Sequence, residues 1–296
     1  MNADLLLQFT PAVLKLREAR NQRAVFRPKW LEHVQSEPWR FDLKRSDPQS
    51  YALIGRQRRP VPLDLAVHLG IWLQQHRHGL NSAVHAFLAL KFPEPTRTEP
   101  IRIGFPITLS QAHFAASPLV QSHLVDGAFL QLLEGFQPYR RGYFGPIQHP
   151  SESSLFWLEK LAQVDKLRSL HVGVGLTRIP QEGFARVEMS REVPHQAQEG
   201  VLVRSGALLL SFRSAHSPLV TVEHLHQPMR LFPDVSGWGD VTTASESWCA
   251  EGQSEFGSYR FLSQRMDAME SEVTEICTKL AELAGANNKL LAVLKR

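Results

Sequence analysis

Basic and aromatic residues are interleaved in two segments of the chain, and this mixture suits contact with nucleic acid. The denser segment runs from Tyr139 to Phe144 and reads YRRGYF, and a looser one runs from Phe26 to Trp30. Arginine neutralises a phosphate and an aromatic face stacks on an unpaired base, so the pattern is typical of single-stranded nucleic-acid binding. An ordinary loop with buried aromatics and solvated arginines has the same composition, and composition alone favours that simpler interpretation.

The charges of the chain are unevenly distributed, with a cationic excess at the N-terminus. Residues 1–60 hold 12 Lys or Arg against 6 Asp or Glu, although the net charge of the whole chain is only +4. Such an excess attracts phosphates or acidic protein surfaces, yet it is modest beside that of dedicated nucleic-acid binders. The two basic groups together give these candidate nucleic-acid contacts: Arg17, Arg20, Arg23, Arg27, Tyr139, Arg140, Arg141 and Tyr143.

The 13 histidines could supply metal ligands or acid–base groups. His76, His78 and His85 are neighbours in sequence, and His224 and His226 would project from one face of a strand, a spacing that can chelate. No acidic or cysteine ligand joins either group at a diagnostic spacing, so we expect no metal.

Familiar catalytic signatures are missing from the chain. It contains no phosphate-binding loop, dinucleotide-binding loop, zinc-peptidase motif or hydrolase nucleophile elbow, so we expect no cofactor and assign no catalytic residue. A cytoplasmic enzyme with a noncanonical, histidine-containing active site is the alternative function, because histidine titrates close to neutral pH.

Cysteine content and hydropathy give an expected location. Cys249 and Cys277 are too few for a disulfide framework, which favours a reducing compartment. The N-terminus lacks the basic start and apolar core of a secretory signal, and no apolar run approaches the roughly 20 residues of a membrane-spanning helix. The sequence therefore predicts a cytoplasmic protein without membrane contact.

The last segment of the chain, residues 259–296, repeats apolar side chains at alternating spacings of four and three. This 3.5-residue period is the seam of a coiled coil. One polar residue, Asn287, interrupts the stripe, and a buried Asn at such a position favours two parallel strands in register. The stripe comprises Leu262, Met266, Met269, Val273, Ile276, Leu280, Leu283, Asn287, Leu290 and Leu294.

The tail therefore predicts self-association as a parallel coiled-coil dimer. Gly285 weakens a helix in the middle of the segment, and Leu291 and Val293 widen the apolar stripe near its end. These features leave two alternatives open: docking of the tail on the body of its own chain, and pairing with a different protein.

The remaining patterns predict an α+β protein with four regions. We expect a mainly helical region with a basic N-terminus over 1–170, an antiparallel β region over 171–232, an acidic Gly/Ser-rich linker over 233–258 and the coiled-coil helix over 259–296.

Within the helical region, the sequence predicts individual elements. Expected helices span 11–24, 62–78, 82–92, 118–136 and 154–170; a strand is expected over 101–109, and 27–60 should be mostly loop. The function that these patterns favour is a non-enzymatic, homo-oligomeric assembly or adaptor protein that contacts nucleic acid through its basic–aromatic segments.

Overall fold

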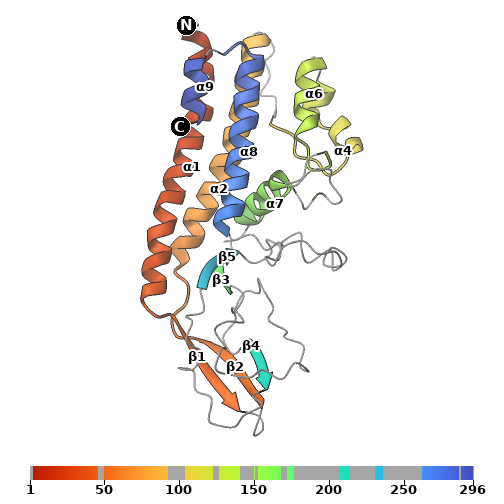
Figure 1. Cartoon of the computed structure of the whole chain (residues 1–296). Coiled ribbons are helices and arrows are strands. Elements are labelled where there is room, and N and C mark those ends of the chain that lie inside the picture. The colour runs from red at the N-terminus through yellow and green to blue at the C-terminus, as the bar shows by residue number, and fades with distance from the viewer. Residues whose placement is uncertain are drawn as a thin grey trace.

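The structure is a computed structural model, and it confirms the expected α+β class. It describes residues 3–45, 50–92, 104–122, 127–140, 150, 153–167, 172–176, 207–213, 231–235, 262–286 and 288–295. These form mostly helices, with two small antiparallel sheets. Figure 1 shows the long helices running alongside one another, with the strands toward one end of them. Among the described helices, none has the length and apolar character needed to cross a membrane.

Helices α1 (Ala3–Gln35) and α2 (Leu63–Lys91) form the framework of the molecule. They are antiparallel, with Lys29 near the end of α1 paired to Asp64 at the start of α2. The helix expected over 11–24 is thus one part of a much longer helix, and Pro11 lies inside it rather than at its first turn. The hydroxyl of Thr10 donates to the carbonyl of Leu6 at 2.8 Å in this stretch.

The helices expected over 62–78 and 82–92 are one helix, because α2 continues without a break through Gly79. Gly79 has a packing role within it. A Cβ atom placed on Gly79 would lie 3.0 Å from Cδ2 of Leu16, so the absence of a side chain lets α1 and α2 approach closely. The buried stripe of α2 confirms its helical period with Leu65, Leu69, Trp72, Leu73, His76, Leu80, Ala83, Val84, Phe87 and Leu88.

The loop expected over 27–60 is also wrong, since a β-hairpin connects the two helices. Strand β1 (Trp39–Arg45) pairs with β2 (Ser50–Gln57), and β2 pairs on its other edge with β4 (Ala207–Arg213), all antiparallel. The sheet therefore combines residues from both sides of the expected boundary at 170. Strand β4 lies in the expected β region, but its partner β2 lies in the N-terminal region.

A second sheet pairs β3 (Val172–Leu176) with β5 (Leu231–Val235). Strand β5 runs past the expected end of the β region at 232. The other residues expected to form strands in this region, and the linker after Val235, lie outside the described residues.

Four shorter helices lie beside the framework: α4 (Gln111–Ala115), α5 (Pro118–Gln121), α6 (Gly127–Gly135) and α7 (Ser154–Leu167). The single helix expected over 118–136 is therefore two, and the described part of the strand expected over 101–109 is irregular. The helix expected over 154–170 is confirmed in α7. It packs on α2, where the amide of Gln74 donates to the carbonyl of Ala162 at 2.7 Å.

The buried amide of Gln137 holds the irregular segment 104–110 against the end of α6. Its Oε1 accepts from the backbone N–H of Thr108 at 2.9 Å, while its Nε2 donates to the carbonyls of Pro106 and Leu133 at 2.8 and 2.9 Å. The side chain is completely buried. These bonds satisfy backbone groups that no regular element provides for.

The tail forms two helices, α8 (Leu262–Leu283) and α9 (Asn288–Lys295), so the single continuous helix expected over 259–296 is wrong in its middle. Gly285 has φ +88°, a left-handed conformation that glycine adopts without steric cost and that ends α8. The chain then turns, and α9 lies beside α1 (Figure 1).

The apolar stripe of the tail packs within one chain. Helix α8 contacts α2 most extensively and also contacts α7, α9, α1 and α6. Its buried residues include Leu262, Met266, Met269, Val273, Ile276 and Leu280, and Leu290 and Leu294 of α9 are buried as well. This is the arrangement that the sequence left open as docking on its own body, and a second chain reaches the same stripe only if these contacts open.

Candidate nucleic-acid interface

Two of the candidate arginines, Arg20 and Arg23 on α1, face the carboxylates of α8. Nε of Arg20 lies 3.1 Å from Oε1 of Glu270, and Nη1 of Arg23 lies 3.0 Å from Oε2 of the same residue. Arg23 also reaches Asp267 at 2.5 Å. Glu270 and Asp267 pair with the two guanidiniums, so the charge of Arg20 and Arg23 is compensated inside the molecule.

Arg20 also binds the far end of the tail. Its Nη2 donates to the carbonyl of Leu294 in α9 at 3.1 Å, and the hydroxyl of Thr274 lies 3.5 Å away. Arg23 donates to the carbonyl of Ser263 at 3.2 Å. The two arginines therefore join α1 to both tail helices, a structural role that sequence reasoning did not assign to them.

A groove of about 530 Å³ lies along this junction. Its lining carries both signs of charge, with Arg20 and Arg23 on α1 and several acids on α8. Lys279 adds a further cation and pairs with Glu282 at 3.0 Å. The mixed lining gives the groove no excess of positive charge with which to attract a phosphate.

The other candidate arginines of α1 are Arg17 and Arg27, and both are exposed. The aromatics of their segment, Phe26 and Trp30, are buried in the core. The aromatics of this segment are therefore buried, as the simpler interpretation expects, whereas Arg27 is exposed to solvent.

In the described part of the segment that begins at Tyr139, the basic and aromatic side chains contact a carboxylate of their own chain. Arg140 lies 2.6 Å from Oε1 of Glu134, and the Tyr139 hydroxyl donates to that oxygen at 3.4 Å. The carboxylate raises the pKa of Arg140, and burial together with Glu134 raises the pKa of Tyr139. Arg141 and Tyr143 lie outside the described residues.

A further group of cations, not among the candidates from sequence, lies on the β1–β2 hairpin. Successive side chains of a strand point to opposite faces, and paired residues share a face. The register Arg40↔Arg56, Asp42↔Ile54 and Lys44↔Ala52 therefore defines one face with six residues. We call it the basic face; it comprises Arg40, Asp42, Lys44, Ala52, Ile54 and Arg56.

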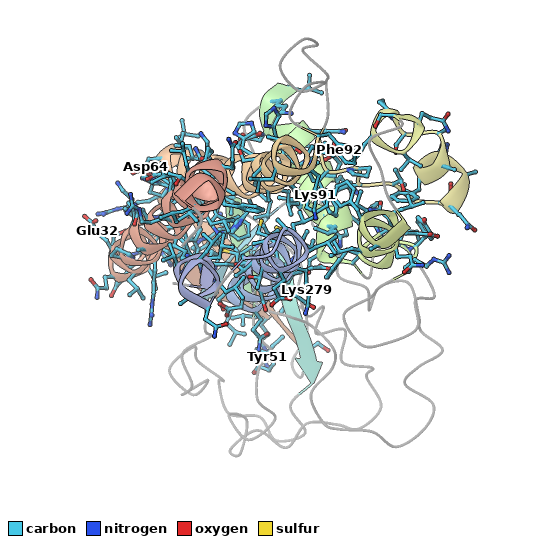
Figure 2. The ribbon with its side chains drawn as sticks, turned by 90° about the horizontal axis from the view of Figure 1, so that it is seen from above. Glu32, Tyr51, Asp64, Lys91, Phe92 and Lys279 are labelled. Carbon is cyan, nitrogen blue, oxygen red and sulfur yellow. The ribbon has the colours of Figure 1, made fainter. Side chains whose placement is uncertain are left out.

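The opposite face of the hairpin is apolar. Trp39, Phe41 and Leu43 of β1 lie on it, opposite β2 residues that include Tyr51 and Leu53. Trp39, Tyr51 and Leu53 are buried. Figure 2 views the molecule from above and shows Tyr51 outside the helical bundle, on the side of β4. Burial of this face fixes the register and turns the basic face to solvent.

The centre of the basic face is a carboxylate shared by two arginines. Nε of Arg40 lies 2.7 Å from Oδ1 of Asp42, and Nε of Arg56 lies 2.6 Å from Oδ2. The arginine side chains are nonetheless 61% and 54% exposed. Asp42 thus orients two guanidiniums side by side and compensates only one of their charges.

Further cations surround this pair. Lys44, Arg58 and Arg59 are exposed, and the backbone N–H groups of Arg58 and Arg59 donate to the carbonyl of Pro38 at 2.7 and 3.2 Å. Arg45 belongs to the opposite face, where it lies over the ring of Tyr51, 5.9 Å from its centroid. Within residues 39–45 and 50–59 there are six cations and one carboxylate, a net charge of +5 from six minus one.

A signal in the sequence could have identified this hairpin. Residues 39–45 read WRFDLKR, in which apolar and charged residues alternate over the first six positions. Strict alternation is typical of a half-buried strand. The four prolines spread through 27–60 obscured it, because they favoured a loop interpretation of the whole stretch.

Two buried ionisable groups of the core, His76 and Cys277, are kept neutral. His76 is fully buried, and its burial, with Arg20 and Arg23 nearby, lowers its pKa to about 3. Burial raises the pKa of the Cys277 thiol to about 12. Neither group reaches solvent, so neither has access to a substrate.

The histidines considered as metal ligands do not gather in the described structure. His76 is buried while His78 and His85 are exposed, and His224 and His226 lie outside the described residues. Across the described ranges, no group of three or more His, Cys, Asp or Glu could hold a metal ion.

Comparisons with protein-family models, curated proteins and solved structures found no match to this chain.

Proposed function

We propose that this protein is a non-enzymatic adaptor that contacts nucleic acid through the basic face of the β1–β2 hairpin. The observation that carries the proposal is the pair Arg40 and Arg56, oriented by Asp42 and largely exposed. A guanidinium bound through Nε presents its remaining N–H groups as a fork, and this fork matches the oxygens of a phosphate. Lys44 on the same face adds a point charge.

The hairpin supports the proposal better than the cations first considered. Arg20 and Arg23 together face two carboxylates, and Arg140 has one of its own, so their charge is balanced by existing ion pairs. Arg40 and Arg56 share a single carboxylate. At the hairpin, cations outnumber the single described carboxylate. Binding there neutralises the positive charge that Asp42 leaves over on Arg40 and Arg56.

The non-enzymatic part of the proposal rests on the environment of the ionisable groups in the core. A general acid or base titrates near the working pH and touches its substrate. His76 satisfies neither condition, since it is buried and has a pKa of about 3. His68 is occupied by Gln22, 2.7 Å away, and His113 by Ser110, 2.9 Å away.

Self-association through the tail is a separate part of the proposal. Because α8 is buried on α2 and α7, a parallel pairing of two tails requires α8 and α9 to leave their own chain. Two copies would then exchange tails, as in domain swapping. Light scattering of the full chain over a wide concentration range tests this, and a monomer throughout would exclude it.

The nucleic-acid part is tested by fluorescence anisotropy with the full chain and mixed-sequence probes at low salt. Binding should weaken steeply as salt is added, because each contact releases condensed counterions. The double variant Arg40→Glu with Arg56→Glu should lose most of the affinity. The double variant Arg17→Glu with Arg27→Glu makes the same charge change on α1. If only the α1 pair weakens binding, the hairpin assignment is wrong, and if no probe binds at low salt, the function itself is wrong.

A further inference from the structure

We infer that the nucleic acid which the basic face accepts is a duplex, held by its phosphates and without regard to base sequence. The inference rests on the proposed function and specifies its ligand. It also revises the expectation from sequence, which favoured single strands because aromatic and basic residues are interleaved. The location of those aromatics in the fold supplies the argument.

Within the described hairpin, the basic face carries no aromatic ring on which a base could stack. Its two uncharged residues are Ala52 and Ile54, and the aromatics of the hairpin lie on the opposite face. Trp39 and Tyr51 there are buried. Single-strand binding without sequence preference draws much of its affinity from bases stacked on aromatic rings, roughly 1–3 kcal/mol per base. The described residues of this face supply no ring for that contribution.

The exposed cation on α1 is likewise without an aromatic neighbour in its own segment. Arg27 is exposed, whereas Phe26 and Trp30, the aromatics beside it in sequence, are buried. The hairpin and the segment from Phe26 to Trp30 thus both present charge to solvent and bury their aromatic rings. Charge without stacking is the property of a surface that reads the phosphate backbone.

The spacing of the cations fits the two sides of a groove. Arg40 and Lys44 lie on one face of β1, four residues apart, which places their Cα atoms about 13 Å from each other in an extended strand. The major groove of B-form DNA is about 12 Å wide. Arg40 and Arg56 at one end and Lys44 at the other are therefore far enough apart to approach phosphates on the two sides of a groove. A duplex holds such phosphates at a fixed separation, whereas a flexible single strand has to be ordered to present them.

The composition of the basic face also removes sequence preference. Bases are read by side chains such as Asn and Gln, and by arginines aimed at the edge of a guanine. The face has no amide side chain, and its two arginines are oriented by Asp42 toward one another. Contacts to phosphate position a protein on nucleic acid but carry no sequence information directly.

The experiment compares a duplex of about 20 base pairs, each of its separated strands and vesicles rich in anionic lipid, all with the full chain at low salt. The duplex should bind at least about tenfold more tightly than either strand, and duplexes of different sequence should bind alike. Arg40→Glu with Arg56→Glu should weaken duplex binding by about tenfold or more and reduce the slope of log affinity against log salt by about 2. Lys91→Glu with Lys166→Glu, at exposed positions on α2 and α7, is the control of equal charge.

The outcomes separate the two proposals. Strands that bind as tightly as the duplex would overturn the duplex inference and leave the proposed function standing. Binding that varies strongly with duplex sequence would overturn the claim of sequence independence. Vesicle binding without any nucleic-acid binding would overturn both proposals and assign the face to a membrane surface. Equal weakening by the hairpin and control variants would show that total charge, and not this face, is responsible.

Discussion

Arg20 of α1 and Glu270 of α8 form an ion pair of 3.1 Å between segments separated by 250 residues in the chain. Their side chains are 23% and 16% exposed, so water screens the pair only in part. Arg20 was a candidate for binding nucleic acid, and α8 was expected to associate with a second chain. In the structure, Arg20 and α8 contact each other within one chain. The ion pair accounts for the basic residue on α1 and for the acidic residue on α8.

The first prediction concerns this junction. Arg20→Met keeps an apolar stem but removes the partner of Glu270 Oε1 and of the Leu294 carbonyl, although Arg23 still binds Oε2, so the free energy of unfolding should fall by about 2 kcal/mol. The measurement is urea denaturation, and the loss should shrink in about 1 M salt because the pair is partly exposed. Arg27→Met, at an exposed position of the same helix, should change the free energy by less than about 0.5 kcal/mol. Equal effects of the two variants would contradict a stabilising role for the junction.

The second prediction concerns acid stability. His76 has a pKa of about 3 in the folded chain against an ordinary value of 6.5, so below about pH 6.5 the unfolded chain binds a proton that the folded chain refuses. Stability therefore falls as the pH falls, by about 2 kcal/mol at pH 5 relative to neutral pH from this group alone.

His76→Phe tests this contribution directly. The new ring can keep the edge contact with Trp72, whose ring centroid lies 4.7 Å from that of His76, but it cannot bind a proton. Denaturation at several pH values should show a weaker loss of stability on acidification than the natural chain shows. His85→Gln, at an exposed site, should keep the full pH dependence. An unchanged pH dependence in His76→Phe would show that other groups cause the acid loss.

The third prediction concerns Gln137. Gln137→Leu preserves size but removes the partners of the Thr108 N–H and the Pro106 carbonyl, so it should lower the free energy of unfolding by about 2–3 kcal/mol. Hydrogen exchange should quicken first at the Thr108 N–H. Gln121→Leu is the matched control, because that amide donates to the carbonyl of Ala115 in an exposed setting. Slow exchange at Thr108 in the Gln137 variant would refute the assignment.

The fourth prediction concerns the turn between α8 and α9. Gly285 has φ +88°, so Gly285→Ala should cost about 1 kcal/mol although open space surrounds the position. Gly135→Ala, at the last residue of α6 and also in open space, should be neutral or slightly stabilising. Thermal denaturation of both variants decides the point. A stabilised Gly285→Ala chain would instead mean that a continuous tail helix is the preferred state.

The sequence by itself determined α7 and the helical stripe of α8. In α8, apolar residues at a helical period predicted a helix and the stripe that it buries, because the period depends only on residues near one another in the chain. The same reasoning failed at Gly79, whose role depends on Leu16 of another helix. It failed again at the hairpin, where the alternation of 39–45 was present but scattered prolines favoured a loop.

Only the tertiary structure decided where the stripe of the tail packs and which cations stay exposed. An apolar stripe is satisfied equally by a second copy or by its own body, and the choice depends on whether α1, α2 and α7 present a matching surface. A group of arginines attracts phosphate strongly only where the carboxylates around it do not balance its charge. Glu270 lies 250 residues from Arg20 in the chain, so the residues near either one do not predict the ion pair. Arg40 and Arg56, in contrast, share one carboxylate and remain exposed to solvent.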